Sequence, residues 1–249
     1  MRKKNKLFCH PNNEELIVKD IGIIFDMDGV IIDTCDLHEK SWFYISKNYN
    51  FTWNNELNFK RNIFGTSSID SATLLFGSHI LKHDLIKICN EKCEIYQELL
   101  RKNINNIVTK GFLSFFNCLV DLKIPIVLGT SSIAYEAEFV LKSLGIFNHF
   151  KAVIDISKVN KPKPHPEVYI KASMALGLSQ WQCIGFEDSL SGITALEKAG
   201  IKCIVIGSTL THEKLISSGL NYDLYIKDFS QITIDEVIDI NRNLIIMGE

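Results

Sequence analysis

The sequence lacks the features that mark nucleic-acid-binding, membrane-spanning or secreted proteins. Its 249 residues carry a net charge of only −2, so it has no basic surplus for binding nucleic acid. No apolar run approaches the ~18 residues needed to span a membrane, and the polar N-terminus lacks the apolar segment of a secretory signal. We therefore expect a cytoplasmic protein with neither nucleic-acid nor membrane partners.

Cysteines are also too few and too irregularly spaced to form a disulfide framework or a zinc site. The seven cysteines are an odd number and include no C-x-x-C pair. Several lie in apolar surroundings, as Cys203 does in the run IKCIVIG. This pattern is typical of buried free thiols in a reducing compartment.

The sequence does have the composition of an α/β protein and its alternation of strand and helix patterns. Hydrophobic residues make up 46% of the chain and charged residues 22%, and this length holds an α/β core plus a smaller insert. From Gly111 onward, short apolar runs alternate with helical patterns. Strand–helix alternation predicts a doubly wound parallel sheet. The expected strands are 21–25, 125–128, 152–156, 183–186 and 203–206, with an edge strand at 222–226.

Between the first and second expected strands the pattern is helical throughout. Apolar residues recur at steps of three and four, and no clear strand occurs between about 36 and 107. This predicts a helical cap domain over 36–107, inserted into a core formed by 19–35 and 108–249, with residues 1–18 as a polar tail. Composition alone leaves open that these helices belong to a single domain.

Two carboxylates follow the first expected strand. The strand 21–25 ends in Asp26, followed by Asp28 and Gly29. Ligands bind beyond the carboxyl ends of the strands in open α/β sheets, and residues i and i+2 point to the same side. Two carboxylates so close repel each other, and a hard cation such as Mg2+ would relieve the repulsion. The alternative is an ordinary turn, because Asp and Gly are common in loops.

A hydroxyl-rich loop follows the second expected strand. Thr130 and Ser131, at the point where a helix begins, offer hydroxyl and backbone N–H groups to an anion such as phosphate. The alternative is that Thr130, Ser131 or Ser132 serves as the N-cap of that helix.

A proline-rich loop between the third and fourth expected strands holds two lysines. Prolines on both sides of Lys163 fix the local backbone and would hold its ammonium in one place. Lys161 also precedes a proline, and the residues alone leave the choice between the two lysines open.

Two acids, Glu187 and Asp188, follow the fourth expected strand. They precede a helix, and polar residues at such a strand end are suited to phosphate chemistry. The alternative is that they only complement the helix dipole.

Three of these segments resemble motifs of the haloacid dehalogenase (HAD) superfamily of phosphatases and phosphomutases. They are DMDGVIIDT from Asp26, KPHPEVY from Lys163 and GFEDSLSGI from Gly185, and Thr130 takes the place of the second motif. The order of the motifs matches the family over about residues 20–207. The chain looks most similar to the β-phosphoglucomutase-like and sugar-phosphatase branch, in which a small helical cap follows the first motif.

The resemblance implies a role for each motif residue. Asp26 would be the nucleophile that forms an aspartyl-phosphate, and Asp28 the general acid and base. Thr130 and Lys163 would stabilise the phosphoryl oxygens, with Gly29 and Ser131 also at the substrate. The implied Mg2+ ligands are the Asp26 carboxylate, the Asp28 backbone carbonyl and Asp188, with Glu187 as an additional acid.

Cap residues would select the substrate. His38 and Trp42 resemble positions after the first motif in β-phosphoglucomutases, and Lys92 with Tyr96 resembles a cap Lys-x-x-x-Tyr. His38 is equally compatible with a half-buried helix residue, and Trp42 with core packing. The mutases carry an arginine at about Ser68, where it grips the second phosphate of a bisphosphate.

The absence of that arginine predicts a phosphatase acting on a small phosphorylated metabolite, such as a sugar or nucleoside phosphate. The alternatives are a β-phosphoglucomutase-type mutase and a catalytically idle binding protein. We expect a monomer.

Overall fold

A computed structural model describes residues 21–53, 59, 63, 68–78 and 80–242 of the chain. Within these residues, no helix has the length and apolar content required to cross a membrane. The tail expected over 1–18 lies outside the described residues.

Six parallel strands form one sheet in the order β3-β2-β1-β4-β5-β6. The first strand is therefore central, and the chain builds outward on one side of it and then on the other. This order creates a crevice at the carboxyl end of β1, between β2 and β4. The predicted doubly wound parallel sheet is confirmed. The strands are β1 (Gly22–Phe25), β2 (Ile126–Gly129), β3 (Phe150–Ile154), β4 (Cys183–Glu187), β5 (Lys202–Ile206) and β6 (Leu224–Ile226).

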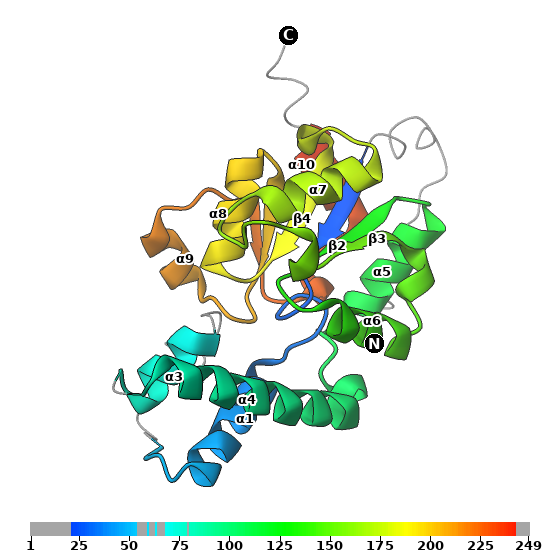
Figure 1. Ribbon diagram of the computed structural model, residues 1–249. Coiled ribbons are helices and arrows are strands. Elements are labelled where there is room, and N and C mark those ends of the chain that lie inside the picture. The colour runs from blue at the N-terminus through cyan, green and yellow to red at the C-terminus, as the bar shows by residue number, and fades with distance from the viewer. Residues whose placement is uncertain (1–20, 54–58, 60–62, 64–67, 79, 243–249) are drawn as a thin grey trace, which may run out of the picture.

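Helices cover both faces of the sheet, and each face has its own apolar core (Figure 1). On one face, Phe25 lies among the phenyl rings of Phe112, Phe116 and Phe186. On the other face, the adjacent residue Ile24 packs with the second set of helices. Side chains alternate across a strand, so both faces of β1 are apolar. The first face carries α5 (Phe112–Asp121), α6 (Ala134–Ser143) and α10 (Ile234–Arg242), and the second carries α7 (Glu167–Leu176), α8 (Leu190–Ala199) and α9 (His212–Ser218).

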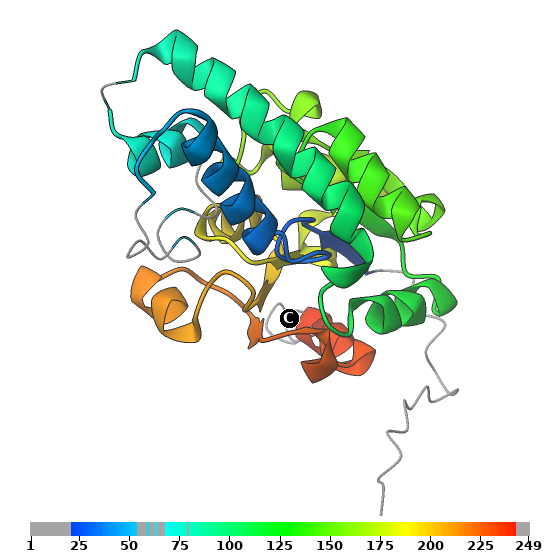
Figure 2. The ribbon, with the colours of Figure 1, turned by 90° about the horizontal axis from the view of Figure 1, so that it is seen from below.

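Three of the described helices, all between β1 and α5 in the chain, form a separate cap with its own core. They are α1 (Cys35–Asn48), α3 (Ser68–Phe76) and α4 (Lys82–Asn103). They lie together below the layered core in Figure 1, and the view in Figure 2 shows α4 running along the outside of the cap. Trp42 is 2% exposed and belongs to the cap core. The predicted helical cap after the first strand is confirmed, and the bounds 36–107 remain our proposal.

The third strand lies two residues earlier than the sequence predicts. It ends at Ile154 because the Asp155 carboxylate accepts a hydrogen bond from the backbone N–H of Ser157, 2.9 Å away. This local bond starts a short 3-10 turn over Ile156–Lys158 and ends the extended conformation.

Candidate active site

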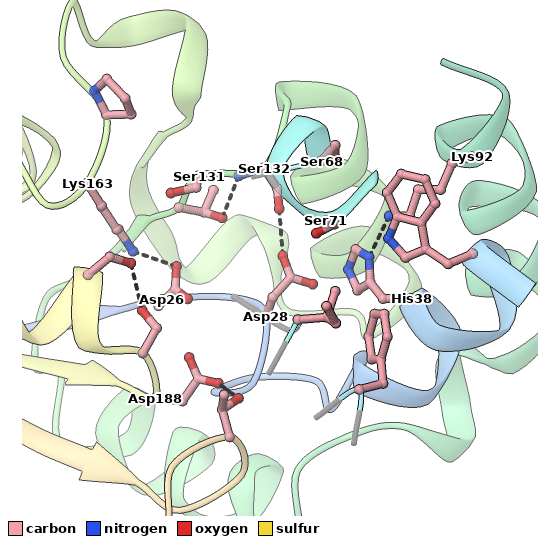
Figure 3. A pocket seen from close by; sticks show the side chains of 18 residues that line it. Asp26, Asp28, His38, Ser68, Ser71, Lys92, Ser131, Ser132, Lys163 and Asp188 are labelled. Carbon is pink, nitrogen blue, oxygen red and sulfur yellow. Dashed lines mark hydrogen bonds and ion pairs between the residues drawn. The ribbon is translucent and has the colours of Figure 1, made fainter. Parts of the chain in front are cut away.

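A cavity of about 440 Å³ lies between the carboxyl ends of the strands and the cap. Core and cap residues both contribute to its wall, as Figure 3 shows. The cavity brings together most of the residues selected from the sequence, although Gly29 and Glu187 do not line it. The selected residues that line it are Asp26, Asp28, His38, Ser68, Lys92, Thr130, Ser131, Lys163 and Asp188.

A buried lysine links two acids at the base of the cavity. Lys163 Nζ lies 2.9 Å from Asp26 Oδ1 and 2.6 Å from Glu187 Oε1, and it donates a third bond to the Gly129 carbonyl. Burial alone would lower the pKa of Lys163, but the two carboxylates hold that pKa above its ordinary value. The ammonium is therefore a permanent charge. Of the two lysines in the proline-rich loop, Lys163 is the one that lines the cavity.

For the Asp26 carboxylate, the loss of solvent on burial outweighs the attraction of Lys163. Burial raises the pKa of Asp26 to about 7, against the opposing effect of Lys163. Its side chain nevertheless reaches the cavity, since Asp26 is one of the lining residues. A second positive charge near this carboxylate would favour its ionised form.

Both carboxylate oxygens of Glu187 are already engaged. Oε1 accepts from Lys163 and from the Tyr169 hydroxyl at 2.5 Å. Oε2 accepts from the backbone N–H groups of Asp188 and Ser189 and from the Ser189 hydroxyl. Burial raises the pKa of Glu187, but Lys163 and these bonds outweigh it and lower the pKa below its ordinary value. Glycine at 192 leaves room for this carboxylate, because a Cβ there would lie 1.7 Å from Oε1.

The Asp188 carboxylate lies close to Gly29, in the loop after β1. Glycine is required at position 29 for two reasons. A Cβ there would lie 1.8 Å from Asp188 Oδ2, and the φ of +79° is strained for other residues. Two hydroxyls of the loop after β5 hold the same oxygen: Ser208 Oγ at 3.3 Å and Thr209 Oγ1.

Three buried carboxylates form a cluster that can hold a metal ion. Oxygens of Asp26, Glu187 and Asp188 all lie within 4.8 Å of one another. Burial, followed by the charges of Glu187 and Asp26, raises the pKa of Asp188 well above its ordinary value. The single positive charge of Lys163 cannot neutralise three ionised carboxylates. A divalent cation, which prefers oxygen ligands, would neutralise the remaining negative charge. The Asp28 carboxylate is not part of this cluster.

Asp28 instead points toward the cap. Its Oδ1 accepts from Thr34 Oγ1 at 2.9 Å and from the Tyr96 hydroxyl at 3.2 Å, and its Oδ2 accepts from Ser132 Oγ at 2.6 Å. Thr34 lies just before the first cap helix, Tyr96 lies in the cap and Ser132 lies in the loop after β2, so donors from three parts of the chain meet on one carboxylate. Figure 3 shows the bond from Ser132. Asp26 and Asp28 have separate hydrogen-bond partners, which fits two different roles.

The alternative interpretation of the loop after β2 as a helix cap is wrong. Helix α6 begins at Ala134, its N-cap is Ile133, and it has no side-chain cap bond. Thr130 Oγ1 instead accepts from the backbone N–H of Ser132 at 3.0 Å, and the Ser132 hydroxyl reaches Asp28. The loop hydroxyls therefore organise the site.

A second buried cation lies in the cap wall. Lys92 Nζ is 2.6 Å from His38 Nδ1, and the His38 ring stacks on Tyr96 with centroids 4.1 Å apart. Lys92 is 3% exposed and lies over the rings of Trp42 and Tyr96. Burial and then Lys92 lower the pKa of His38 well below its ordinary value, so a neutral imidazole accepts from the ammonium.

Several residues of the site escaped the sequence analysis. Thr34, Tyr169, Ser208 and Thr209 all bond to acids of the site. Thr209 lies three residues after the end of β5. A polar residue just after a strand is the signal that identified Thr130, and the same signal identifies Thr209. Tyr169 is the last residue of KPHPEVY, and nothing in the sequence shows where its hydroxyl points.

The chain is similar to known proteins over most of its length. The family profile described as haloacid dehalogenase-like hydrolase matches residues 23–206. A β-phosphoglucomutase of Bacillus subtilis is 28% identical over 218 residues, which cover 86% of this chain and 92% of that protein. The fructose-1-phosphate phosphatase YqaB of Escherichia coli is 28% identical over 183 residues, covering 74% and 94% of the two chains.

A solved structure gives the same result for the fold. The crystal structure of a family IA, variant 3 HAD hydrolase from Entamoeba histolytica superposes with a TM-score of 0.78 and 30% identity. The match covers 89% of this chain and 99% of that one. The chain belongs to the haloacid dehalogenase-like hydrolases, in the branch that contains β-phosphoglucomutases and sugar phosphatases.

Proposed function

We propose that this enzyme is a Mg2+-dependent phosphatase that hydrolyses a small phosphomonoester, such as a sugar or nucleoside phosphate. The observation that carries the proposal is the position of Asp26. It lines the cavity at the carboxyl end of β1, 2.9 Å from the ammonium of Lys163 and within the carboxylate cluster. A carboxylate beside a fixed cation can attack a phosphoryl group whose charge that cation neutralises.

In the first step, an Asp26 oxygen attacks phosphorus in line and the bond from phosphorus to the substrate alcohol breaks. Asp28 donates a proton to the departing alkoxide, and the product is an aspartyl-phosphate. In the second step, Asp28 takes a proton from water, which attacks phosphorus and releases inorganic phosphate with Asp26 restored. Lys163, Thr130 and the loop at Ser131 hold the phosphoryl oxygens.

The metal would be held by Asp26, Asp188 and the backbone carbonyl of Asp28. When bound, Mg2+ would withdraw charge from the phosphoryl oxygens. Because both Glu187 oxygens already accept hydrogen bonds, we assign Glu187 to holding Lys163 in place. Gly29, His38 and Lys92 complete the substrate surroundings in this proposal, and cap closure excludes bulk water. A monomer in the cytoplasm remains our expectation.

A β-phosphoglucomutase-type reaction is the second candidate, and the similarity to the Bacillus subtilis mutase favours it. The two reactions differ in the acceptor of the phosphoryl group, which is water in one and a sugar hydroxyl in the other. A mutase has to hold a bisphosphate, and arginine grips phosphate with two bonds. Ser68 lines the cavity with one hydroxyl and no charge, which supports the phosphatase.

Phosphorus NMR distinguishes the two reactions. The enzyme is incubated with Mg2+, β-glucose 1-phosphate and a trace of the 1,6-bisphosphate. We expect free phosphate as the main product, and rapid accumulation of glucose 6-phosphate with little free phosphate would favour the mutase. Ser68→Arg should slow phosphate release more than phospho-enzyme formation. Ser68→Ala, which removes the hydroxyl without adding charge, serves as the control.

A further inference from the structure

Tyr169 touches the lysine of the site although it does not line the cavity. It lies on α7 and is 0% exposed. Lys163 Nζ is 4.8 Å from the centroid of its ring. The ring fits there because residue 129 is glycine: a Cβ on Gly129 would lie 3.2 Å from Tyr169 Cε1. The ring face is therefore fixed against the ammonium, a favourable arrangement for a buried cation.

The Tyr169 hydroxyl shares its acceptor with the ammonium. It donates to Glu187 Oε1 at 2.5 Å, and Lys163 Nζ donates to the same atom at 2.6 Å. The ammonium also bonds to Asp26, so two acids compete for one cation. A hydroxyl on Glu187 Oε1 withdraws part of the negative charge that would otherwise act on Lys163 alone. In a buried site that redistribution is strong, because little solvent screens it.

We infer that Tyr169 is a positioning residue whose hydroxyl weakens the hold of Glu187 on Lys163, which leaves the ammonium directed at Asp26 and the phosphoryl group. This inference rests on the proposed phosphatase function. The phenyl ring of a phenylalanine at position 169 would fill the same space, so the proposed effect on Lys163 depends on the Tyr169 hydroxyl alone. A displacement of about 1 Å is enough to lower a rate by about two orders of magnitude.

Tyr169→Phe tests the inference, because it removes the hydroxyl and keeps the ring. The Mg2+-loaded full chain is assayed with p-nitrophenyl phosphate, and inhibition by orthovanadate, which mimics the five-coordinate phosphoryl group, is measured in parallel. We expect kcat to fall about tenfold, as for the loss of a hydrogen bond to a charged group. The vanadate inhibition constant should rise by a similar factor, with KM changed less than about twofold.

The vanadate constant separates positioning from folding. A variant that is merely less well folded loses kcat in proportion to its inactive fraction, while the inhibition constant of the active remainder stays at the wild-type value. Unchanged kcat, or reduced kcat with an unchanged vanadate constant, would overturn the inference. Tyr49→Phe is the matched control, because Tyr49 also donates to a carboxylate, Glu91 Oε1 at 2.8 Å, but in the cap. It should leave both values unchanged.

Failure of the proposed function gives a different result. If the wild-type enzyme releases no phosphate from p-nitrophenyl phosphate or from a panel of sugar phosphates, the phosphatase proposal falls and the role of Tyr169 falls with it. If the wild-type enzyme is active and Tyr169→Phe matches it in both constants, only the inference about Tyr169 is wrong.

Discussion

The hydroxyl of Tyr96, on cap helix α4, donates a hydrogen bond to Asp28 Oδ1, 3.2 Å away. The proposed general acid is thus in contact with the domain that would close over the substrate. Thr34, just before the first cap helix, and Ser132, in the loop after β2, hold the same carboxylate. Because these donors come from separate parts of the chain, a shift of the cap changes the surroundings of Asp28 directly.

Tyr96→Phe should therefore lower kcat while the protein stays folded. Phenylalanine retains the ring that stacks on His38, and two donors to Asp28 remain. We expect a loss of about three- to tenfold, the effect of one typical intramolecular hydrogen bond. Steady-state kinetics measure it, with Tyr44→Phe on the exposed surface of the cap as control. A wild-type kcat in Tyr96→Phe would show that this contact has no catalytic role.

Metal removal should abolish activity reversibly. The carboxylate cluster carries more negative charge than Lys163 balances, so EDTA is expected to stop turnover and added Mg2+ to restore it. Ca2+ should substitute poorly, because its longer and more variable coordination misplaces the attacking carboxylate. Phosphate release is followed after dialysis and re-addition of each ion. Full activity in chelated, metal-free enzyme would remove the metal from the account.

Gly192→Ala should damage the site from outside the cavity. The added Cβ would lie 1.7 Å from Glu187 Oε1, so the carboxylate that holds Lys163 has to move. We expect kcat/KM to fall by about two orders of magnitude.

Gly145→Ala is the control for Gly192→Ala, since a Cβ there meets nothing within 4 Å. Its φ of +72° makes alanine strained, at a cost of about 1–2 kcal/mol in stability, with activity retained. Equal activity losses in the two variants would contradict a specific effect on Glu187.

The metal-free protein should show a pH-dependent stability that arises from Asp26. Its pKa is about 7 in the folded protein against an ordinary 3.8. Between these values the folded state binds the proton more tightly than the unfolded state does. The contribution of Asp26 to the free energy of unfolding therefore falls as pH rises from about 4 to about 7.

Asp26→Asn does not titrate, so in EDTA its melting temperature relative to wild type should rise between pH 5 and pH 8. Asp188, whose pKa is also raised, is present in both proteins, and loss of the Asp26 charge lowers the pKa of Asp188 in the variant, which changes the difference in the same direction. Added Mg2+ should reduce the difference, because a cation favours the ionised carboxylate. A difference in melting temperature that is constant across this range would contradict the role of burial at Asp26.

The parts of this molecule that sequence patterns predict are those with local causes. Apolar runs with punctuating glycines locate the strands to within one or two residues, and strand ends locate Asp26, Thr130 and Asp188. Long-range side-chain contacts have no such signature. The hydrogen bond from Ser132 to Asp28 spans 104 positions in the chain. Ser132 is one of three residues that the sequence allows as the N-cap of the next helix, and only the fold shows that its hydroxyl bonds to Asp28.

Glu187 shows the same limit in another form. The resemblance of its segment to a family motif implies that Glu187 is an additional acid of the metal site. Both of its oxygens, however, accept bonds from Lys163, Tyr169 and the residues just before α8. Only the fold shows that, of the adjacent acids Glu187 and Asp188, Glu187 has both oxygens engaged in hydrogen bonds.

Trapping the phospho-enzyme tests the central claim, nucleophilic attack by Asp26, most directly. Enzyme with Mg2+ is mixed with p-nitrophenyl phosphate, quenched in acid within the first turnover and treated with borohydride, which reduces an aspartyl-phosphate to homoserine. Peptide mass spectrometry should locate the reduced residue at position 26. Asp26→Asn should give neither the reduced peptide nor measurable phosphate release, with a wild-type circular dichroism spectrum. Appreciable turnover by pure Asp26→Asn, or reduction at another residue in the active wild-type enzyme, would contradict the account.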